Sequence, residues 1–590
     1  MNPLKSVLTG LMLLFAFSGI SQTAIYVNHV AYNAQGPKKA VISTDQSLNG
    51  VKFSLINEAN KKTEFNGLLT SAGKIEEWTP GKLYYSADFT SFKKSGNYRV
   101  RISQQNKAYT SEAFKIGEHA LSDATLGAIV HYYHKQRANT PQELEGDKKM
   151  LLYGSDKTVD IRGGWADASG DISKYFSHLA YANFMSPQQI PMVTWSMANT
   201  YEKIPGTLTR LGIKDSLLSE ALWGTDYIMR SLSKEGYFYM TVFSYFKPDI
   251  TARRIVGLEA DSKTTSDYQC AFREGGGMGI AALARISSWK KDGEFSASDY
   301  LAAAKRAYAH LALNNLKYTD DGKENIIDDY CALMAATELW IATDSAYYGE
   351  EAGKRAANLG HRMTDQGYFI ADDKDRPFWH AADAGLPVIA LSRYLTKEKN
   401  AGKRTAALGV IKKALDYNLK VTNAVGNPFG YARQTFKYKG AVKDGFFIPH
   451  ENETGWWWQG ENARLGSLAA AALVGGRLVY PANNAWGLRA DLAGYAQQQM
   501  SWILGCNPYN VCFMYEFGKN NVPYMKALFG HGSQRGGISN GITGKKENGD
   551  GSGIDYKIED GGNEWRWTEQ WIPHSGWFLQ ALTAITPESK

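Results

Sequence analysis

Two carboxylates stand close together in a short segment that runs Gly-Gly-Trp-Ala-Asp-Ala-Ser-Gly-Asp-Ile-Ser-Lys-Tyr from Gly163 to Tyr175. Its glycines make this a poor helix and a good loop, and they let the backbone approach a ligand closely. Because neighbouring acids repel, we expect the pKa values of Asp167 and Asp171 to be pushed apart. One carboxylate can then activate a water molecule while its neighbour orients it. A solvated or calcium-binding surface loop is the alternative interpretation.

Two aromatic residues flank these acids. Trp165 and Tyr175 offer flat faces of the kind on which sugar rings stack, so we expect both to contact a carbohydrate. The segment resembles the Gly-Gly-Trp-x-Asp-Ala-Gly-Asp-x-x-Lys-Tyr signature of glycoside hydrolase family 9, whose members include many cellulases and some exo-acting relatives. One departure is an extra residue, Ser169, which changes the spacing of the two carboxylates relative to the family pattern.

Cleavage of a glycosidic bond also needs a protonated acid to assist the departing oxygen. The resemblance implies a glutamate just before the final helix, and two glutamates are candidates. Glu569 stands seven residues before Gly576, close to the family spacing between the acid and the small residues of the last helix, whereas Glu564 lies in a literal Asn-Glu pair. We favour Glu569, because Trp567 and Trp571 beside it would desolvate the carboxyl and raise its pKa.

The resemblance also implies residues that grip the sugar next to the scissile bond. A Leu-Gly-Cys-Asn-Pro run at 504–508 matches the end of a late family helix, and the following loop, Phe529–Arg535, partly matches a His-rich family loop that ends in arginine. We therefore expect His531 and Arg535 to bind substrate. A second histidine of the usual motif is absent.

A second polar segment, Phe447–Arg464, combines three consecutive tryptophans with many hydrogen-bonding side chains. Unpaired amides and carboxylates are costly to bury, so this mixture suits a wet cleft that binds hydroxyl-rich rings. We expect Trp456 and Trp457 to contact the ligand, although consecutive residues on a helix point in different directions. His380 and Arg433 are further substrate-binding candidates in neighbouring loops, with a structural role as the alternative for His380.

The resemblance implies hydrolysis with inversion in a single displacement, with Asp171 as general base, Asp167 as its helper and Glu569 as general acid. The expected substrate is a β-linked glucan, down to short cello-oligosaccharides, while a glucosaminide or a mixed-linkage glucan stays open. No cellulose-binding module or dockerin-like tail is visible, which favours soluble oligosaccharides and exo action. The alternatives are a polysaccharide lyase on a helical toroid and, because of the inserted Ser169, a catalytically inactive glycan-binding protein.

The composition fits a large globular protein with a carbohydrate cleft. The chain has 590 residues, 44% of them hydrophobic, with 16 Trp and 34 Tyr. A net charge of +7 is spread along the chain without a dense run of Lys and Arg, so we expect no nucleic-acid partner. The sequence predicts no oligomeric state.

Residues 1–21 have the layout of a secretory signal peptide: a lysine, an apolar run from Leu8 to Phe17, and small residues before the expected cleavage after Ser21. We therefore expect an exported protein, periplasmic or extracellular. The cleavage site has no nearby cysteine that could carry a lipid anchor. No later apolar run approaches the ~18 residues that span a bilayer, so we expect no membrane insertion.

Four cysteines are too few for a disulfide framework. Cys506 and Cys512 could pair, but we favour ordinary buried thiols. We expect no required cofactor. Aspartate-rich loops are compatible with a structural calcium ion, although no EF-hand pattern is present and no metal ligands are assigned.

Two domains follow the leader. Residues 22–117 alternate apolar and polar residues in short runs between turns, which predicts a β-sandwich. This part resembles the immunoglobulin-like module that precedes some family 9 catalytic domains. We expect it to pack against and stabilise the catalytic domain, and glycan binding is the alternative. Residues 118–590 show helical periodicity, and the family resemblance implies an (α/α)6 toroid for them. The helices are expected near residues 121–134, 193–201, 217–232, 279–289, 300–316, 326–342, 385–395, 405–419, 463–478, 488–504 and 575–584.

Overall fold

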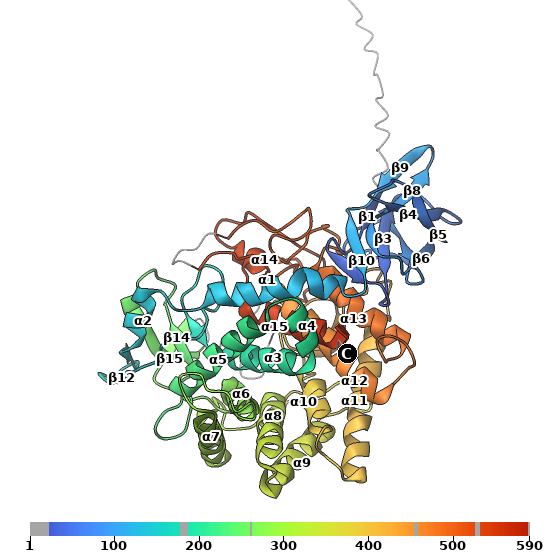
Figure 1. Cartoon of the computed structure of the whole chain (residues 1–590). Coiled ribbons are helices and arrows are strands. Elements are labelled where there is room, and N and C mark those ends of the chain that lie inside the picture. Colours follow the sequence, from blue (N-terminus) through green and yellow to red (C-terminus); the bar gives the residue numbers. More distant parts are fainter. Residues whose placement is uncertain (1–22, 178–186, 260–261, 453–457, 526–530, 588–590) are drawn as a thin grey trace, which may run out of the picture.

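Strands form the N-terminal part of the chain and long helices form most of the rest (Figure 1). The computed structural model describes residues 23–177, 187–259, 262–452, 458–525 and 531–587. The N-terminal strands are β1 (Ala24–Tyr26), β2 (Ala31–Asn33), β3 (Lys39–Thr44), β4 (Lys52–Asn57), β5 (Thr63–Leu68), β6 (Thr70–Gly73), β7 (Leu83–Asp88), β8 (Gly96–Gln104), β9 (Lys107–Thr110) and β10 (Phe114–Gly117).

These strands form two sheets that enclose an apolar core, as the alternating pattern predicts. One sheet has the order β1-β3-β7-β6, and the other has the order β2-β10-β8-β4-β5 with β9 paired to β8. Along β8, Tyr98, Val100 and Ile102 are buried, while Arg99 and Arg101 between them face outward. Alternate residues of a strand point to opposite faces, so this strand presents one apolar face to the core.

The helical part begins at α1, directly after β10. Its long helices are α1 (Ala120–Gln136), α3 (Ile190–Lys203), α5 (Lys214–Arg230), α6 (Gly277–Ser287), α7 (Ala297–Tyr318), α8 (Ile326–Thr343), α9 (Ala346–His361), α10 (Leu386–Tyr394), α11 (Ala401–Thr422), α12 (Asn462–Val479), α13 (Ala490–Ile503) and α15 (Ile572–Ile585). The short helices are α2 (Pro141–Asp147), α4 (Pro205–Arg210) and α14 (Trp565–Thr568).

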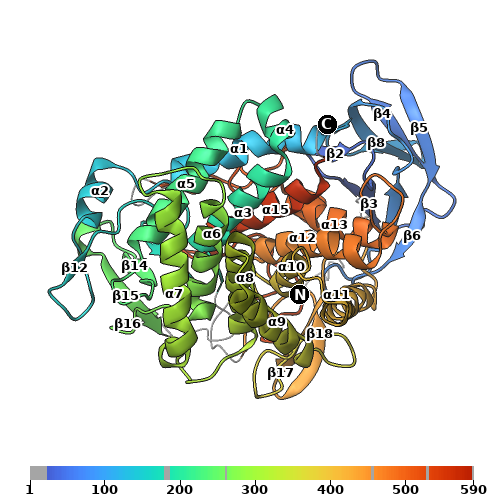
Figure 2. The same ribbon diagram turned by 60° about the horizontal axis from the view of Figure 1, so that its bottom comes forward.

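Six helices pack in a closed cycle in which each contacts the next: α3, α6, α8, α10, α12, α15 and back to α3. They are apolar nearly all round, and in α6 every residue is buried. A helix without a polar face must be covered on all sides. The cover comes from α1, α5, α7, α9, α11 and α13, which pack outside the cycle (Figure 2).

The structure contains a helix at each predicted range and adds α9, which the periodicity does not reveal. Glycine and alanine occupy much of the inward face of α9, where Gly349, Ala352 and Ala356 are buried. A Cβ atom at Gly349 would lie 2.8 Å from the Trp340 ring, so this helix packs closely on α8 because its contact residues are small. Small residues give a weak apolar signal in a sequence.

Long connections run from most outer helices to the N-terminal end of the next inner helix, and they carry the remaining strands, whereas α7 and α8 are joined by a short loop. A four-stranded sheet has the order β13-β14-β15-β16, formed by β13 (Lys174–Tyr175), β14 (Thr241–Phe243), β15 (Arg254–Glu259) and β16 (Lys263–Thr265). Two-stranded sheets pair β11 (Met150–Leu151) with β12 (Thr158–Val159) and β17 (Gln434–Tyr438) with β18 (Ala441–Gly445).

The β-sandwich is anchored on the helical part by one buried tryptophan. Trp78 packs against an aromatic group from the C-terminal half of the chain, with ring centroids 4.4 Å apart for Phe446 and 5.7 Å apart for Trp502. The backbone N–H of His29 also donates to the carbonyl of Leu504 at 2.8 Å. This packing agrees with the supporting role expected for the sandwich.

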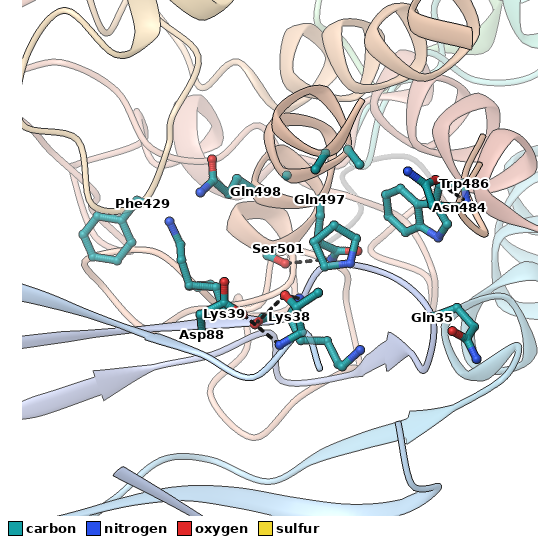
Figure 3. A pocket seen from close by; sticks show the side chains of 16 residues that line it. Gln35, Lys38, Lys39, Asp88, Phe429, Asn484, Trp486, Gln497, Gln498 and Ser501 are labelled. Carbon is teal, nitrogen blue, oxygen red and sulfur yellow. Dashed lines mark hydrogen bonds between the residues drawn. The ribbon is translucent and has the colours of Figure 1, made fainter. Parts of the chain in front are cut away.

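The segment around Asn427–Arg433, which the sequence suggests as a cleft loop, belongs to this interface instead. Lys39 donates to the carbonyl of Pro428 at 2.9 Å, and the ring of Phe429 packs edge-on against Tyr26 and Tyr84. A cavity of about 370 Å³ remains between the sandwich and α13, lined by Lys38 and Lys39 on one side and by residues such as Trp486 and Gln497 on the other (Figure 3).

All four cysteines are buried and unpaired, as favoured from the sequence. Burial raises the pKa of the Cys506 and Cys512 thiols to about 12. In the part of the chain that the structure describes, no helix is both long and apolar enough to cross a membrane. Among the same residues, no three His, Cys, Asp or Glu side chains gather where they could hold a metal ion.

Candidate active site

The two aspartates lie in the connection between α1 and α3, in a loop held from both sides. The N–H of Ala166 donates to the carbonyl of Gln136 at the end of α1, and the N–H of Asp167 donates to the carbonyl of Ser173 across the loop. Gly170 has a φ of 88°, a conformation that side chains with a Cβ rarely adopt. The glycine lets the chain turn between the two acids.

Asp171 binds all of its hydrogen-bond donors through one oxygen. Oδ1 accepts from the N–H groups of Ile172 and Ser173 at 2.6 and 3.0 Å, and from the hydroxyls of Ser173 and Ser244 at 3.0 and 2.8 Å. Among the described residues, no donor contacts Oδ2. Within this part of the chain, the side chain is thus fixed through Oδ1.

Asp167 is held by the segment that precedes α15. Its Oδ1 accepts from the indole N–H of Trp571 at 2.8 Å, and its carbonyl accepts from the N–H of Ile572 at 3.1 Å. Burial raises the pKa of Asp167 well above its ordinary value, and the charge of Asp171 raises it further. The pKa of Asp167 therefore reflects the repulsion between neighbouring acids that the sequence predicts.

The inserted Ser169 joins the aspartate loop to the segment that carries Glu569. Its N–H donates to the carbonyl of Gln570 at 2.8 Å, and its hydroxyl accepts from the N–H of Gln570 at 2.9 Å. Ala168 and Trp571 form an antiparallel bridge beside this pair. The extra residue supplies a connection between two chain segments that are about four hundred positions apart.

Glu569 lies beside these aspartates. Burial raises the pKa of its carboxyl well above the ordinary value, and the negative charges of Asp167 and Asp171 raise it further. The amide of Asn540 donates to Oε2 of Glu569 at 3.4 Å, and the N–H of Asn540 donates to the Glu569 carbonyl at 2.9 Å. The three carboxyl groups form one electrostatically coupled cluster, in which Glu569 favours its protonated form.

A buried histidine fixes the amide of Asn540. Nε2 of His574 lies 2.7 Å from Oδ1 of Asn540, and because that oxygen can only accept, the histidine must donate. Burial lowers the pKa of His574 to about 3, so the ring is neutral. This contact turns the NH₂ group of Asn540 toward Glu569.

Glu564, the alternative acid, is placed differently. It is the N-cap residue of α14, and its Oε2 accepts from the N–H of Gly562 at 2.9 Å. Backbone hydrogen bonds lower the pKa of Glu564, which favours the charged form. A carboxylate that is already ionised is a poor proton donor, and no contact joins it to Asp167 or Asp171 in the described part of the chain.

His531 lies against the aspartate loop, where its carbonyl accepts from the N–H of Gly170 at 2.6 Å. Its Nε2 is 2.7 Å from Oε1 of Glu143 on α2, and its buried Nδ1 has no partner within the described residues. Burial alone would raise the pKa of Glu143, but the hydrogen bond and charge of His531, with hydrogen bonds from Thr140, lower it to about 2.

Three predicted substrate-binding residues are buried in the protein interior, which corrects their interpretation. Trp165 is fully buried and donates its indole N–H to Glu220, and Tyr175 is 1% exposed within β13. His380 is also fully buried, and its Nδ1 accepts from the N–H groups of Ala382 and Asp383. Without an accessible face, none of the three can stack on or bind a sugar from this position.

The two predicted arginines hold loops at other places. Arg433 donates to the carbonyls of Val421 and Asp444, so it supports the β17–β18 hairpin beside the interface rather than the carboxyl cluster. The exposed guanidinium of Arg535 lies over the ring of Phe517, 4.7 Å from its centroid, and no described contact joins it to the cluster. Trp456 and Trp457 lie outside the described residues.

The sequence does not single out several residues that border the cluster. Ser244 follows β14 and binds Asp171, and Asn540 binds Glu569. Tyr132 and Gln136 on α1 and Gln189 before α3 are buried near the aspartates. Serine and amide residues are common in loops, so only the tertiary structure distinguishes these from their neighbours.

Comparison with known proteins decides the family. Residues 123–548 match the family model described as "Glycosyl hydrolase family 9", and residues 21–107 match the one described as "Cellulase N-terminal ig-like domain". The chain belongs to glycosyl hydrolase family 9. It is therefore a glycoside hydrolase with an immunoglobulin-like N-terminal part. The matched segment includes Asp167 and Asp171 and ends before Glu569, so the placement of the acid in this family 9 chain depends on the contacts above.

Relatives of this family 9 enzyme agree with that assignment. Endoglucanase 3 of Oryza sativa subsp. japonica is 22% identical over 409 residues, which are 68% of this chain and 75% of the relative. The fold is similar to that of a Zn-binding triple mutant of the family 9 endoglucanase J30, with a TM-score of 0.63, 17% identity, and coverage of 95% of this chain and 100% of the other. Cel9M of C. cellulolyticum in complex with cellobiose has a TM-score of 0.50 at 18% identity, covering 78% and 96%.

Proposed function

We propose that this family 9 protein is an inverting glycoside hydrolase that cleaves β-linked glucan chains, and cello-oligosaccharides in particular, with exo action. The observation that carries the proposal is the cluster of Asp167, Asp171 and Glu569, in which Asp171 is held through Oδ1 within the described part of the chain and Glu569 favours its protonated form. An inverting glycosidase needs this combination of one base and one acid.

Asp171 is the proposed general base. Its Oδ1 is engaged by four donors, and Oδ2 can accept a proton from a water molecule that approaches the anomeric carbon. Burial and the charge of Asp171 raise the pKa of Asp167, which favours its neutral form. Its carboxyl can orient the same water by a hydrogen bond.

Glu569 is the proposed general acid. The raised pKa keeps its carboxyl protonated, and Asn540 holds it in place. As the water oxygen bonds to the anomeric carbon, the bond from that carbon to the leaving oxygen breaks. Glu569 gives its proton to that oxygen, and Asp171 takes one from the water. Solvent then returns the two carboxyl groups to their initial states.

The proposed arrangement around this site is the (α/α)6 toroid that the family resemblance implies. The closed cycle of six inner helices, each covered by outer ones, supports it. We place the catalytic domain at residues 118–590 and the immunoglobulin-like domain at 22–117, after a signal peptide at 1–21 that directs export to the periplasm or beyond. The reaction uses carboxyl groups and water and needs no cofactor. A structural calcium ion stays a prediction.

The substrate class is inferred from relatives and from the chemistry of the site. Solved relatives are complexed with cellobiose and, in CelQ from Clostridium thermocellum, with cellotetraose. A carboxylate base and a protonated acid suit a neutral sugar. A polysaccharide lyase would instead need basic residues that neutralise the carboxylate of a uronate. We therefore propose cello-oligosaccharides as the first substrates to test.

The proposal is tested by following hydrolysis of cello-oligosaccharides with proton NMR. We expect the α-anomer to appear first, because a single displacement inverts a β-linkage. Initial appearance of the β-anomer would contradict inversion. An unsaturated product that absorbs in the ultraviolet would show a lyase instead, and binding without any product would show an inactive glycan-binding protein.

A further inference from the structure

The turn that follows β14 is tied directly to Asp171. Ser244 donates its hydroxyl proton to Oδ1 of Asp171 at 2.8 Å, and its N–H donates to the hydroxyl of Ser173 at 3.0 Å. The N–H of Phe246 donates to the Ser244 hydroxyl at 3.1 Å. The two residues after Ser244 are therefore positioned by the same hydrogen bonds that hold the carboxylate.

Both of these residues adopt a backbone conformation that bulky side chains disfavour. Tyr245 has a φ of 55° and Phe246 a φ of 53°, which lie in the left-handed region. A β-carbon is crowded there, and a pair of adjacent aromatic residues in this region is an exceptional arrangement. Such strain persists where the surrounding structure imposes it, and it occurs most often at functional sites.

Packing does not explain why a phenylalanine occupies this position. Phe246 is 63% exposed, and its ring meets Phe243 only edge-on, with centroids 5.2 Å apart. Tyr245, by contrast, is partly buried against Phe243 at 5.0 Å. Single exposed aromatic residues are ordinary on a surface. This one combines exposure, strain and a two-residue distance from the group that holds Asp171.

Trp165 and Tyr175, two of the aromatic residues expected to contact a sugar, are buried. We propose that Phe246 is the platform on which a pyranose ring of the glycan chain stacks, beside the sugar attacked at Asp171. This inference rests on the proposed function. The flat, apolar face of a phenyl ring suits the C–H face of a sugar, and the strained turn holds the ring outward where the chain can reach it.

The test compares three variants of the full-length protein on cello-oligosaccharides of increasing length. We expect Phe246→Ala to raise KM by about three- to ten-fold for the longer substrates, since an aromatic contact of this kind is worth about one tenfold step in binding. kcat and its pH profile should stay close to those of the parent. Phe246→Trp, which keeps an aromatic face, should preserve KM.

Phe246→Asn separates binding from folding. Asparagine tolerates the left-handed region better than phenylalanine does, so the melting temperature should be equal to or higher than that of the parent while KM rises as for Phe246→Ala. The matched control is Tyr347→Ala on the outer helix α9, where a ring 50% exposed has no connection to Asp171. KM should be unchanged in that control.

The outcomes distinguish this inference from the proposed function. If the parent enzyme hydrolyses the oligosaccharides and Phe246→Ala leaves KM unchanged at every length, Phe246 does not stack on the sugar. The proposed hydrolase function is then unaffected. A clear fall in melting temperature for Phe246→Asn would make the ring structural and would also overturn the inference. If the parent protein hydrolyses none of the oligosaccharides, the proposed function itself fails.

Discussion

Asp171 and Glu569 have different surroundings. Oδ1 of Asp171 accepts hydrogen bonds from backbone and hydroxyl donors. Glu569 is desolvated and lies near two other acids, which raises its pKa and disfavours its charged form. The proposed base is therefore held by hydrogen bonds, and the proposed acid is held in a buried, acidic environment.

The first prediction concerns the acid. Replacing Glu569 by Gln should lower kcat on an unactivated cello-oligosaccharide by about 10²- to 10⁴-fold, because general acid catalysis typically contributes that much. The same measurement on Glu564→Gln is the matched control, and it should stay within about two-fold of the parent, since the carboxylate of Glu564 accepts from the backbone of its own loop. Equal losses in the two variants would contradict the assignment.

The second prediction concerns stability against pH. The pKa of Glu569 is higher in the folded protein than its unfolded value of about 4.3. Between these two values the folded state binds more protons than the unfolded state, so the stability of the parent falls as pH rises through the folded pKa. Glu569→Gln removes this titration.

Scanning calorimetry across pH checks this sign. The melting temperature of Glu569→Gln relative to the parent should increase as pH rises above about 4.3, and the difference should be smallest at lower pH, where both side chains are neutral. A difference that shrinks with rising pH would mean that Glu569 is stabilised as an anion in the folded protein.

The sequence predicts individual acids better than their surroundings. Asp167 and Asp171 stand out because their spacing is distinctive, but the donors from Ser244 and Asn540 come from distant segments and are ordinary residue types. Trp165 and His380 were predicted to bind substrate, but both are buried. Their neighbours indicate a loop near the site, but local sequence does not say which side of a loop faces the core.

At the scale of elements, the inserted Ser169 connects the aspartate loop to the extended segment before α15. Two hydrogen bonds connect it to Gln570, next to Glu569. Its side chain is fully buried, so no water can replace the hydroxyl if it is removed. The relative position of base and acid therefore depends on this residue.

The third prediction follows from that contact. Ser169→Ala leaves the N–H of Gln570 without the acceptor, which should lower the free energy of unfolding by about 1–3 kcal/mol and reduce kcat. Urea denaturation and oligosaccharide hydrolysis measure the two effects. Ser54→Ala, which removes an exposed hydroxyl bonded to Asn66, should change neither. An unaltered stability in Ser169→Ala would show that the hydrogen bond between Ser169 and Gln570 is not needed.

Element types were predictable where an apolar face contains large residues, as in α3 and α13. They were not predictable for α9, because its contacts with α8 are made through glycine and alanine. The sheet β13–β16 could not be predicted either, since β13 has only two residues and pairs with a strand 66 or more positions away.

At the scale of the whole molecule, the sandwich has an apolar core of its own, and some of its residues also join the large core of the helical part. Trp78 belongs to the sandwich by sequence, but it packs within the large cluster of the helical part. The order of the two parts was predictable from the change in periodicity. Their interface was not, and the loop near Phe429 was assigned to a cleft because aromatic and polar residues mix in both kinds of surface.

The fourth prediction tests this shared core. Trp78→Ala should lower the free energy of unfolding by about 3–5 kcal/mol, because it removes a large buried side chain from a close-packed aromatic group. Trp78→Phe should lose less. Calorimetry measures both, and kcat at a temperature where each variant is folded should match the parent, since Trp78 contacts none of the three carboxyl residues. A melting temperature equal to that of the parent would contradict a shared core.

The position of Trp78 also bears on how the chain is made. A ribosome releases the sandwich first, whereas Phe446 and Trp502 emerge hundreds of residues later. Until then the indole has no native partner, and nascent chains that expose such surfaces are prone to associate with one another. Contacts between distant segments also form slowly. Slower elongation through the last third of the chain would therefore lengthen the period in which newly made copies can aggregate.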